Sequence, residues 1–154
     1  MVEPNLKSHL KGKVAILGFG NRLWGDDGAG SVLAELLQQA VPEAAVFDGG
    51  MVPENYLEKV AATDPDEILL IDAADFGGEA GEWRIFSGED LAFTGLSTHA
   101  GSPRMLAAYL EERTGAQVRL LAIQSGDVMQ GDELSTAMTE TVKKVAREIG
   151  VFQS

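Results

Sequence analysis

Three residues that could form one metal-recognition site lie at separate points of this sequence: Asp27, Asp72 and His99. Asp27 lies in a glycine-rich turn, Asp72 directly follows the apolar run Glu67–Ile71, and His99 precedes a predicted helix. Two carboxylates and one imidazole suit zinc, nickel or a similar divalent ion. Three protein ligands with one open position are typical of a site that engages another molecule at the metal. Spacing alone does not establish that the three side chains meet.

Each of these residues also has a purely structural interpretation. The acidic pair Asp26 and Asp27 stands before a predicted helix, where a cap contributes about 1 kcal/mol. One of the two could cap the helix and leave the other pointing into a crevice; with Asp27 in the site, Asp26 would be the cap. Asp72 could cap the loop that follows it, and His99 could hydrogen-bond the loop before its helix.

The turn that begins Gly18-Phe19-Gly20 partly matches a dinucleotide-binding fingerprint. The fingerprint requires a further glycine three residues on, and Leu23 occupies that position. The acidic pair would also repel a pyrophosphate at a helix N-terminus. The glycines therefore favour a tight strand-to-helix turn over a nucleotide site.

Strands and helices are expected to alternate along almost the whole chain. The apolar runs predict strands at Lys13–Leu17, Ala44–Phe47, Glu67–Ile71, Glu82–Phe86 and Gln117–Ile123. Helical spacing and capping residues predict helices at Ser31–Gln39, Pro53–Ala62, Ser102–Arg113 and Ser135–Ile149. This alternation predicts a three-layer α/β/α sandwich around a mostly parallel, twisted sheet, with Glu82–Phe86 as an added antiparallel strand. We expect one domain over residues 1–154, of which 1–12 are a polar leader.

Composition narrows the classes of function. The chain has no cysteine, which excludes disulfides, thiolate metal sites and a cysteine nucleophile, and which suits the cytoplasm. The formal charge of −12, without a cluster of Lys and Arg, argues against nucleic acid as a partner. No apolar run is long enough for a membrane span, so no membrane partner is expected. No Gly-x-Ser-x-Gly or His-Glu-x-x-His hydrolase signature occurs.

Short motifs in a fixed order resemble the nickel–iron hydrogenase maturation proteases, and in particular the branch that serves hydrogenases of the formate hydrogenlyase (hydrogenase 3) type. The matching segments are Gly18–Asn21, Gly25–Gly30, Asp48–Gly50, Val52–Asn55, Leu70–Asp75, Gly81–Ile85, Ser97–His99 and Leu121–Gln124. They cover most of the chain apart from the leader and the tail.

The resemblance implies an endopeptidase that removes the C-terminal extension of a hydrogenase large-subunit precursor once nickel is inserted. It implies that Asp27, Asp72 and His99 contact the metal and serve catalysis. It also implies that the segment after the second strand contributes to the choice of substrate, which here means Asp48, Gly49, Gly50 and Met51. The nickel would arrive with the precursor, no organic cofactor is implied, and we expect a monomer.

Two other classes of function stay open at this point. The first is a non-enzymatic module that binds a metal-loaded subunit without cutting it. The second is a small-molecule hydrolase with its own metal, which should retain that metal tightly when isolated. An endopeptidase, by contrast, should release a defined peptide from its precursor.

Overall fold

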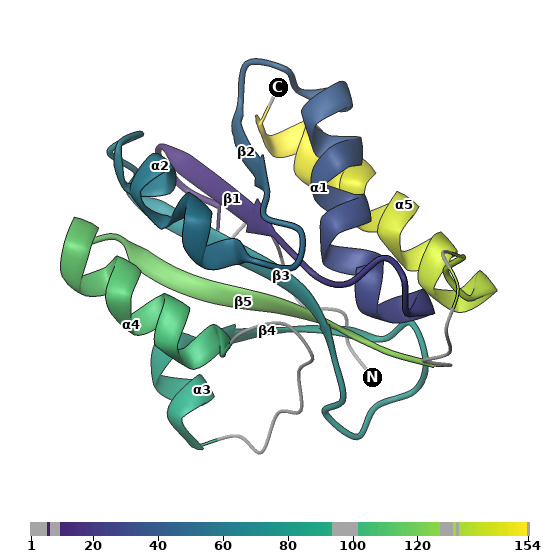
Figure 1. The fold of residues 1–154 in the computed structure, drawn as a ribbon. Coiled ribbons are helices and arrows are strands. Elements are labelled where there is room, and N and C mark those ends of the chain that lie inside the picture. Colours follow the sequence, from purple (N-terminus) through teal and green to yellow (C-terminus); the bar gives the residue numbers. More distant parts are fainter. Residues whose placement is uncertain (1–5, 7–9, 94–101, 127–130, 132, 154) are drawn as a thin grey trace.

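A five-stranded sheet with helices on both faces forms the protein (Figure 1). The computed structural model describes residues 6, 10–93, 102–126, 131 and 133–153. The strands are β1 (Val14–Gly18), β2 (Ala45–Asp48), β3 (Glu67–Ala74), β4 (Trp83–Ser87) and β5 (Gln117–Gln124). Their order in the sheet is β2-β1-β3-β5-β4. All neighbouring pairs are parallel except β4 and β5, which are antiparallel.

The helices divide between the two faces of the sheet. They are α1 (Ala29–Ala40), α2 (Leu57–Ala61), α3 (Gly88–Phe93), α4 (Pro103–Thr114) and α5 (Thr136–Gln153), with short 3-10 turns η2 (Gly25–Gly28) and η3 (Pro53–Tyr56). Helices α1 and α5 lie side by side and share one apolar core with the sheet, and α2, α3 and α4 cover the other face (Figure 1). The predicted three-layer α/β/α fold and the antiparallel strand at Glu82–Phe86 are confirmed.

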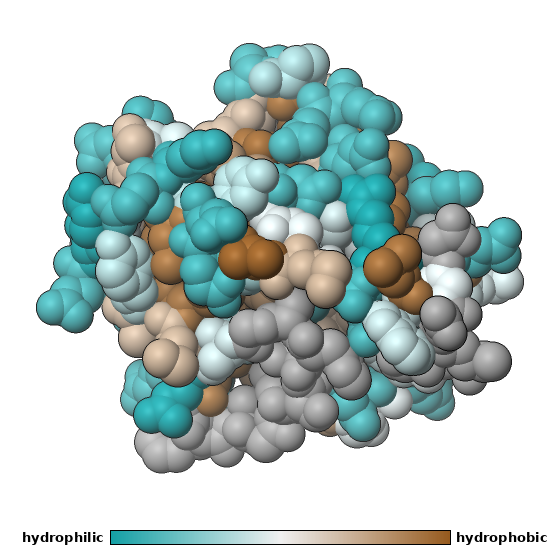
Figure 2. All heavy atoms as spheres, in the orientation of Figure 1, coloured by the Kyte–Doolittle hydropathy of each residue, from teal (hydrophilic) through white to brown (hydrophobic). Residues whose placement is uncertain are grey.

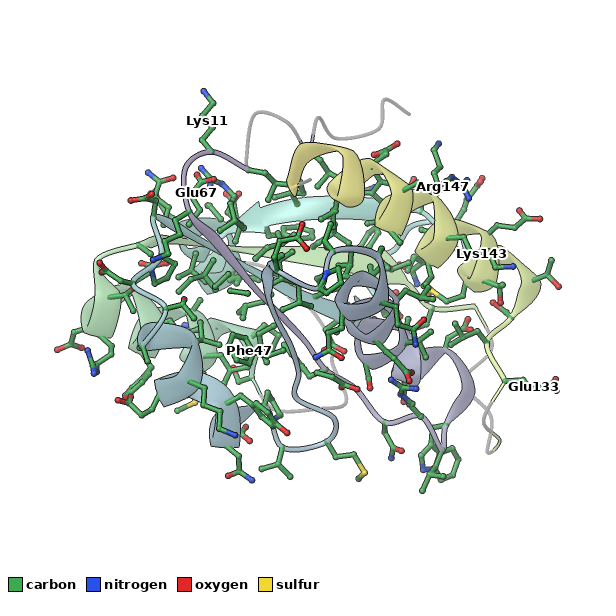
Figure 3. All side chains as sticks on the ribbon, turned by 90° about the horizontal axis from the view of Figure 1, so that it is seen from above. Lys11, Phe47, Glu67, Glu133, Lys143 and Arg147 are labelled. Atoms are coloured by element: carbon green, nitrogen blue, oxygen red, sulfur yellow. The ribbon has the colours of Figure 1, made fainter. Side chains whose placement is uncertain are left out.

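Local chemistry explains where the long helices begin and end. The hydroxyl of Ser102 accepts a hydrogen bond from the amide of Met105, Pro103 occupies the first turn of α4, and Gly115 ends the helix in the left-handed region at φ 75°. On α5, the charged side chains of Lys143 and Arg147 lie on the outer surface (Figure 3). The apolar residues of the same helix, Met138, Val142, Val145 and Ile149, are buried at helical spacing.

Some boundaries differ from those predicted. Strand β3 continues through Asp72 to Ala74, because the residues after Asp72 are small and apolar and pair with β5. The helix predicted at Pro53–Ala62 is divided into η3 and the short α2. Helix α3 was not predicted, since six residues are too few for a helical repeat; a reciprocal pair of hydrogen bonds between Ser87 and Asp90 caps it.

Two residues of the predicted polar leader belong to the core. Leu6 and Leu10 are buried in the cluster beneath α1 and α5. The backbone amide of Lys11 donates to Glu67 at the start of β3 at 2.8 Å, and these two residues lie near one another in Figure 3. The part of this segment that the structure describes is thus packed against the domain.

The order of the strands reverses at β1. The chain passes from β1 through α1 to β2 on one side, and then crosses back through α2 to β3 on the other side of β1. Right-handed crossovers in opposite directions place α1 and α2 on opposite faces of the sheet. In sheets of this kind ligands bind beyond the carboxyl ends of the strands at such a reversal, which here lies between β1 and β3. None of the helices described is long and apolar enough to cross a membrane.

Candidate active site

Asp27 lies beyond the carboxyl end of β1, in the loop that leads to α1. The loop is held in place by backbone hydrogen bonds: the amide of Phe19 donates to Ile71 in β3 at 3.0 Å, and the amide of Asn21 donates to the carbonyl of Asp27 at 3.1 Å. The side chain of Asp27 is within η2 and is 5% exposed. The turn thus places a buried carboxylate at the strand-order reversal.

Asp72 lies inside β3, two residues before the strand ends. It is 2% exposed and pairs in register with Ala122 of β5. Its neighbours Ile71 and Ala73 point to the core beneath α1 and α5, so Asp72 points to the face covered by α2, α3 and α4. One of its carboxylate oxygens, Oδ2, is buried without a hydrogen-bond partner among the described residues.

The two aspartates are close enough for the charge of one to affect the other. Burial raises the pKa of Asp72 well above its usual range, a hydrogen bond from the amide of Ala73 opposes this rise, and the negative charge of Asp27 adds to it. Two carboxyl groups thus share one desolvated site. Asp72 could not hold its charge there at low cost without a positive partner.

Close packing of glycines fixes the position of this pair. A Cβ added to Gly30 in α1 would lie 2.3 Å from both the carbonyl oxygen of Ile71 and that of Phe19. A Cβ added to Gly20, whose φ is 148°, would lie 2.0 Å from the carbonyl oxygen of Asp27. These contacts are possible only without a side chain, so the two glycines allow α1 and its turn to approach the ends of β1 and β3.

His99, the third predicted ligand, lies outside the described residues. The helix that follows it, α4, packs on the face of the sheet to which Asp72 points. Among the described residues, which leave out His99, no group of three His, Cys, Asp or Glu side chains is placed to hold a metal ion.

The segment from Asp48 to Met51 lies at the same edge of the sheet. Asp48 ends β2, and the amide of Gly49 donates to Gly18 at the end of β1 at 2.8 Å. The amide of Gly20 in the Asp27 loop donates to the carbonyl of Gly50, also at 2.8 Å. The side chain of Met51 is exposed. The loops that follow β1 and β2 therefore form one connected edge.

Both oxygens of the Asp48 carboxylate are already engaged. Oδ1 accepts from the hydroxyl of Ser31 at 2.7 Å and from the amide of Gly50 at 3.0 Å, and Oδ2 accepts from Arg22 at 3.0 Å. Arg22 also donates to Ser31 and to Glu35. Asp48 thus shapes its loop through intramolecular contacts. Arg22 and Ser31 were not predicted, since no local spacing relates them to Asp48.

Comparisons with known proteins show the family to which this chain belongs. The family model described as hydrogenase maturation protease matches residues 31–150. The hydrogenase 3 maturation protease of Escherichia coli (strain K12) is 38% identical over 112 residues, which cover 71% of this chain and 70% of that protein. The chain belongs to the hydrogenase maturation protease family. The predicted family, its hydrogenase 3 branch and the predicted class of enzyme, an endopeptidase, are confirmed.

Solved structures support the assignment of the chain to this family. A [NiFe] hydrogenase maturation protease from Thermococcus kodakarensis KOD1 superposes with a TM-score of 0.87 at 34% identity, and covers 96% of this chain and 97% of its own. An endopeptidase from Escherichia coli gives a TM-score of 0.79 at 30% identity, over 93% of this chain and 92% of its own. Family membership favours an endopeptidase over the binding module and the small-molecule hydrolase.

Asp26 does not cap α1 in the protease, so that prediction is wrong. The cap position of α1 is Gly28, and no side chain makes a cap hydrogen bond there. Asp26 is fully buried and accepts hydrogen bonds from the amide of Gly126 and from the amide and hydroxyl of Ser135. These donors lie beyond the end of β5 and at the start of α5. The neighbouring aspartates therefore face different surroundings, and only Asp27 contributes to the pair with Asp72.

Proposed function

We propose that this endopeptidase removes the C-terminal extension of a nickel–iron hydrogenase large-subunit precursor after nickel insertion, and that Asp27, Asp72 and His99 recognise the bound nickel. The observation that carries the proposal is the buried pair of Asp27 and Asp72 at the reversal of strand order. Membership of the hydrogenase maturation protease family supports the choice of substrate.

A divalent ion suits the electrostatics of this pair. Two carboxyl groups in one desolvated site repel each other when both are ionised, and Asp72 has an oxygen that no described residue satisfies. A cation placed between them would stabilise both charges and supply a partner for Asp72. In this proposal the cation is part of the substrate, so the precursor is cleaved only when it is loaded.

His99 supplies the third ligand in the proposal. His99 is three positions before Ser102, the cap of α4, and a chain segment of that length spans at most about 11 Å. Because α4 covers the face to which Asp72 points, a ligand in the preceding segment could approach the pair from that side. Carboxylates from two strand ends and an imidazole from a third segment would then surround one ion.

Recognition of the ion would position the peptide bond for hydrolysis. The nickel is held in the precursor near its C-terminal extension, so fixing the ion fixes the bond to be cut, and small displacements there can cost about 100-fold in rate. A carboxylate beside the bond to be cut is suited to accept a proton from an attacking water, and Asp27 and Asp72 are the described carboxylates of the pair. The segment Asp48–Met51 would contact the precursor through Met51 and its backbone. We expect a monomer.

The decisive experiment compares nickel-loaded with nickel-free precursor and weighs the products by mass spectrometry. We expect the wild-type enzyme to release a defined C-terminal peptide from the loaded form alone. Asp27→Asn, Asp72→Asn and His99→Ala should each abolish release. Asp75→Asn is the matched control: Asp75 follows the same strand but is exposed, and it should cleave at the wild-type rate. Equal cleavage of the nickel-free precursor would overturn recognition of the metal.

A metal-binding measurement tests the source of the nickel independently. Three ligands without a thiolate should bind free divalent ions weakly, because sites with a complete ligand set compete better. Equilibrium dialysis of the isolated protein should therefore retain no stoichiometric metal. Tight retention of one ion per chain would favour a hydrolase with its own metal.

A further inference from the structure

Large apolar side chains are exposed next to the candidate site. We define the apolar rim as Leu23, Trp24, Met51 and Val52, whose side chains are between 44% and 64% exposed. The first two lie in the loop after β1, and the other two lie in the loop after β2. Met105 and Tyr109 of α4 are the other exposed large hydrophobic residues in the part of the chain that is described.

The two loops that carry the apolar rim are joined directly to each other. The amide of Gly20 donates to the carbonyl of Gly50, and Arg22 forms an ion pair with Asp48 at 3.0 Å. The backbone on either side of Trp24 is also held, because Gly131 exchanges hydrogen bonds of 2.7 and 2.8 Å with Gly25 and Leu23. The rim is thus presented on a connected backbone, which lowers the entropy cost of binding a partner.

The apolar rim lies beside the buried carboxyl pair. The amide of Asp27 donates to the carbonyl of Trp24 at 3.1 Å, so the exposed indole and the buried carboxylate come from one turn. On the face shown in Figure 2, brown and tan side chains lie between α2 and the loop that leads into α1, among hydrophilic ones. The rim and Asp27 therefore lie at the same edge of the sheet.

We infer that the apolar rim is the docking surface for the large-subunit precursor and binds apolar side chains next to its nickel. This rests on the proposed function, and it adds Leu23, Trp24 and Val52 to the predicted Met51. Exposed Trp, Leu and Met side chains mark a site of protein–protein interaction. The chain has a formal charge of −12, but these apolar contacts do not require a basic partner. Tryptophan is enriched among the residues that dominate binding energy.

The position of the apolar rim favours the precursor, and not a second copy of this chain, as the partner that binds there. A second copy seated on the rim would cover the edge at which Asp27 and Asp72 lie, and would block the entry of an ion. The precursor is the one partner that must approach this edge for cleavage to occur. The same contact then serves both binding and positioning of the bond.

Binding of the full-length enzyme to purified nickel-free precursor, measured by calorimetry, tests this inference. Trp24→Ala and Met51→Ala should each raise the dissociation constant by roughly tenfold, as truncation of a central interface residue does. Tyr109→Ala is the matched control. Tyr109 is 44% exposed, as is Trp24, but it lies in α4 and in neither of the two loops that carry the rim. This control should bind within about twofold of wild type.

Nickel-free precursor separates this inference from the proposed function, because it offers no ion to the carboxyl pair. Unchanged affinity of both rim variants would overturn the docking surface and leave metal recognition standing. Cleavage of nickel-free precursor at the full rate would overturn metal recognition and leave a rim-dependent affinity standing. A dimer of the wild-type enzyme in light scattering, lost in Trp24→Ala, would assign the rim to a second copy and contradict the inference. Thermal unfolding should show equal stability of the rim variants and wild type, since these side chains are exposed.

Discussion

Asp26 accepts two hydrogen bonds from Ser135, one from its amide at 2.7 Å and one from its hydroxyl at 2.9 Å, across 109 residues of sequence. The same hydroxyl accepts from the amide of Met138 at 3.2 Å and so caps α5. Asp26 also accepts from the amide of Gly126 at 2.8 Å. One buried carboxylate therefore connects the turn that carries Asp27 to the end of β5 and the start of α5.

We predict that Asp26→Ala lowers the free energy of unfolding by about 3 kcal/mol or more, because it removes a fully buried, charged acceptor of three hydrogen bonds. Urea denaturation followed by circular dichroism measures this loss. Asp90→Ala is the comparison, since Asp90 only caps the short α3 at the surface and should cost about 1 kcal/mol. Equal losses in the two variants would contradict the connecting role of Asp26.

Asp72→Asn should stabilise the protein more at about pH 8 than at about pH 5. The raised pKa of Asp72 means that the native state keeps a proton that the unfolded chain releases, so stability falls as the pH rises from the unfolded pKa towards the native one. Asparagine does not titrate, so the variant lacks this fall. Thermal unfolding of both proteins across this range measures the difference.

Asp75→Asn provides the control for the pH experiment. Hydrogen bonds from Gly77 and Gln124 lower the pKa of Asp75, which is exposed. Any stability that this carboxylate contributes is present above its unfolded pKa and is lost only at lower, more acidic pH. The difference between Asp75→Asn and wild type should therefore stay constant from about pH 5 to about pH 8. A difference for Asp72→Asn that is equally constant would rule out the raised pKa.

Gly30→Ala should destabilise the protein by about 2 kcal/mol or more, because the added methyl group would overlap two backbone carbonyl oxygens at the ends of β1 and β3. Gly150→Ala should act in the opposite direction. Gly150 lies in α5 with nothing within 4 Å of an added Cβ, so alanine should stabilise the helix by about 0.5–1 kcal/mol. Denaturant midpoints of the two variants test the contrast, and a shift of the same sign in both would contradict it.

Arg22→Ala should weaken cleavage by raising KM for the precursor, and should change the free energy of unfolding only slightly. Its guanidinium holds Asp48, Ser31 and Glu35 and so sets the loop that ends in the apolar rim, but it is partly exposed, so the loss in unfolding free energy should be about 1 kcal/mol or less. Displacement of that loop should raise KM for the precursor. Arg113→Ala, which breaks an exposed pair with Glu58 on α2, should leave KM unchanged. Steady-state kinetics on nickel-loaded precursor compares the two, and equal KM values would refute the coupling.

Much of the fold follows from local patterns in the sequence. The fully buried run Val14–Gly18 and the apolar start of β3 predict central strands, because parallel strands covered on both faces need apolar side chains throughout. Hydrogen bonds made within a few residues mark the ends of α4 at Ser102 and Gly115, and the fixed φ of Pro103 suits its first turn. These features were predictable since the interactions that create them are close in the sequence.

The candidate site was predictable only in part. The position of Asp72 late in an apolar run places a carboxylate at the carboxyl edge of the sheet, and an acid in the turn after β1 reaches the same edge. The different surroundings of Asp26 and Asp27 were not predictable, because adjacent residues in one turn have the same local sequence. The donors that bind Asp26 come from residues 126 and 135.

The sequence by itself determined the alternation of strands and helices, the family resemblance and the acidic residues available for a site, because each depends on residue type and near-neighbour spacing. The tertiary structure alone decided which carboxylates share that site. Packing of Gly30 against Ile71 brings the turn of Asp27 onto β3, where burial and the charge of Asp27 raise the pKa of Asp72. Such contacts join segments that lie far apart in the chain, and only the folded sheet brings them within reach of one another.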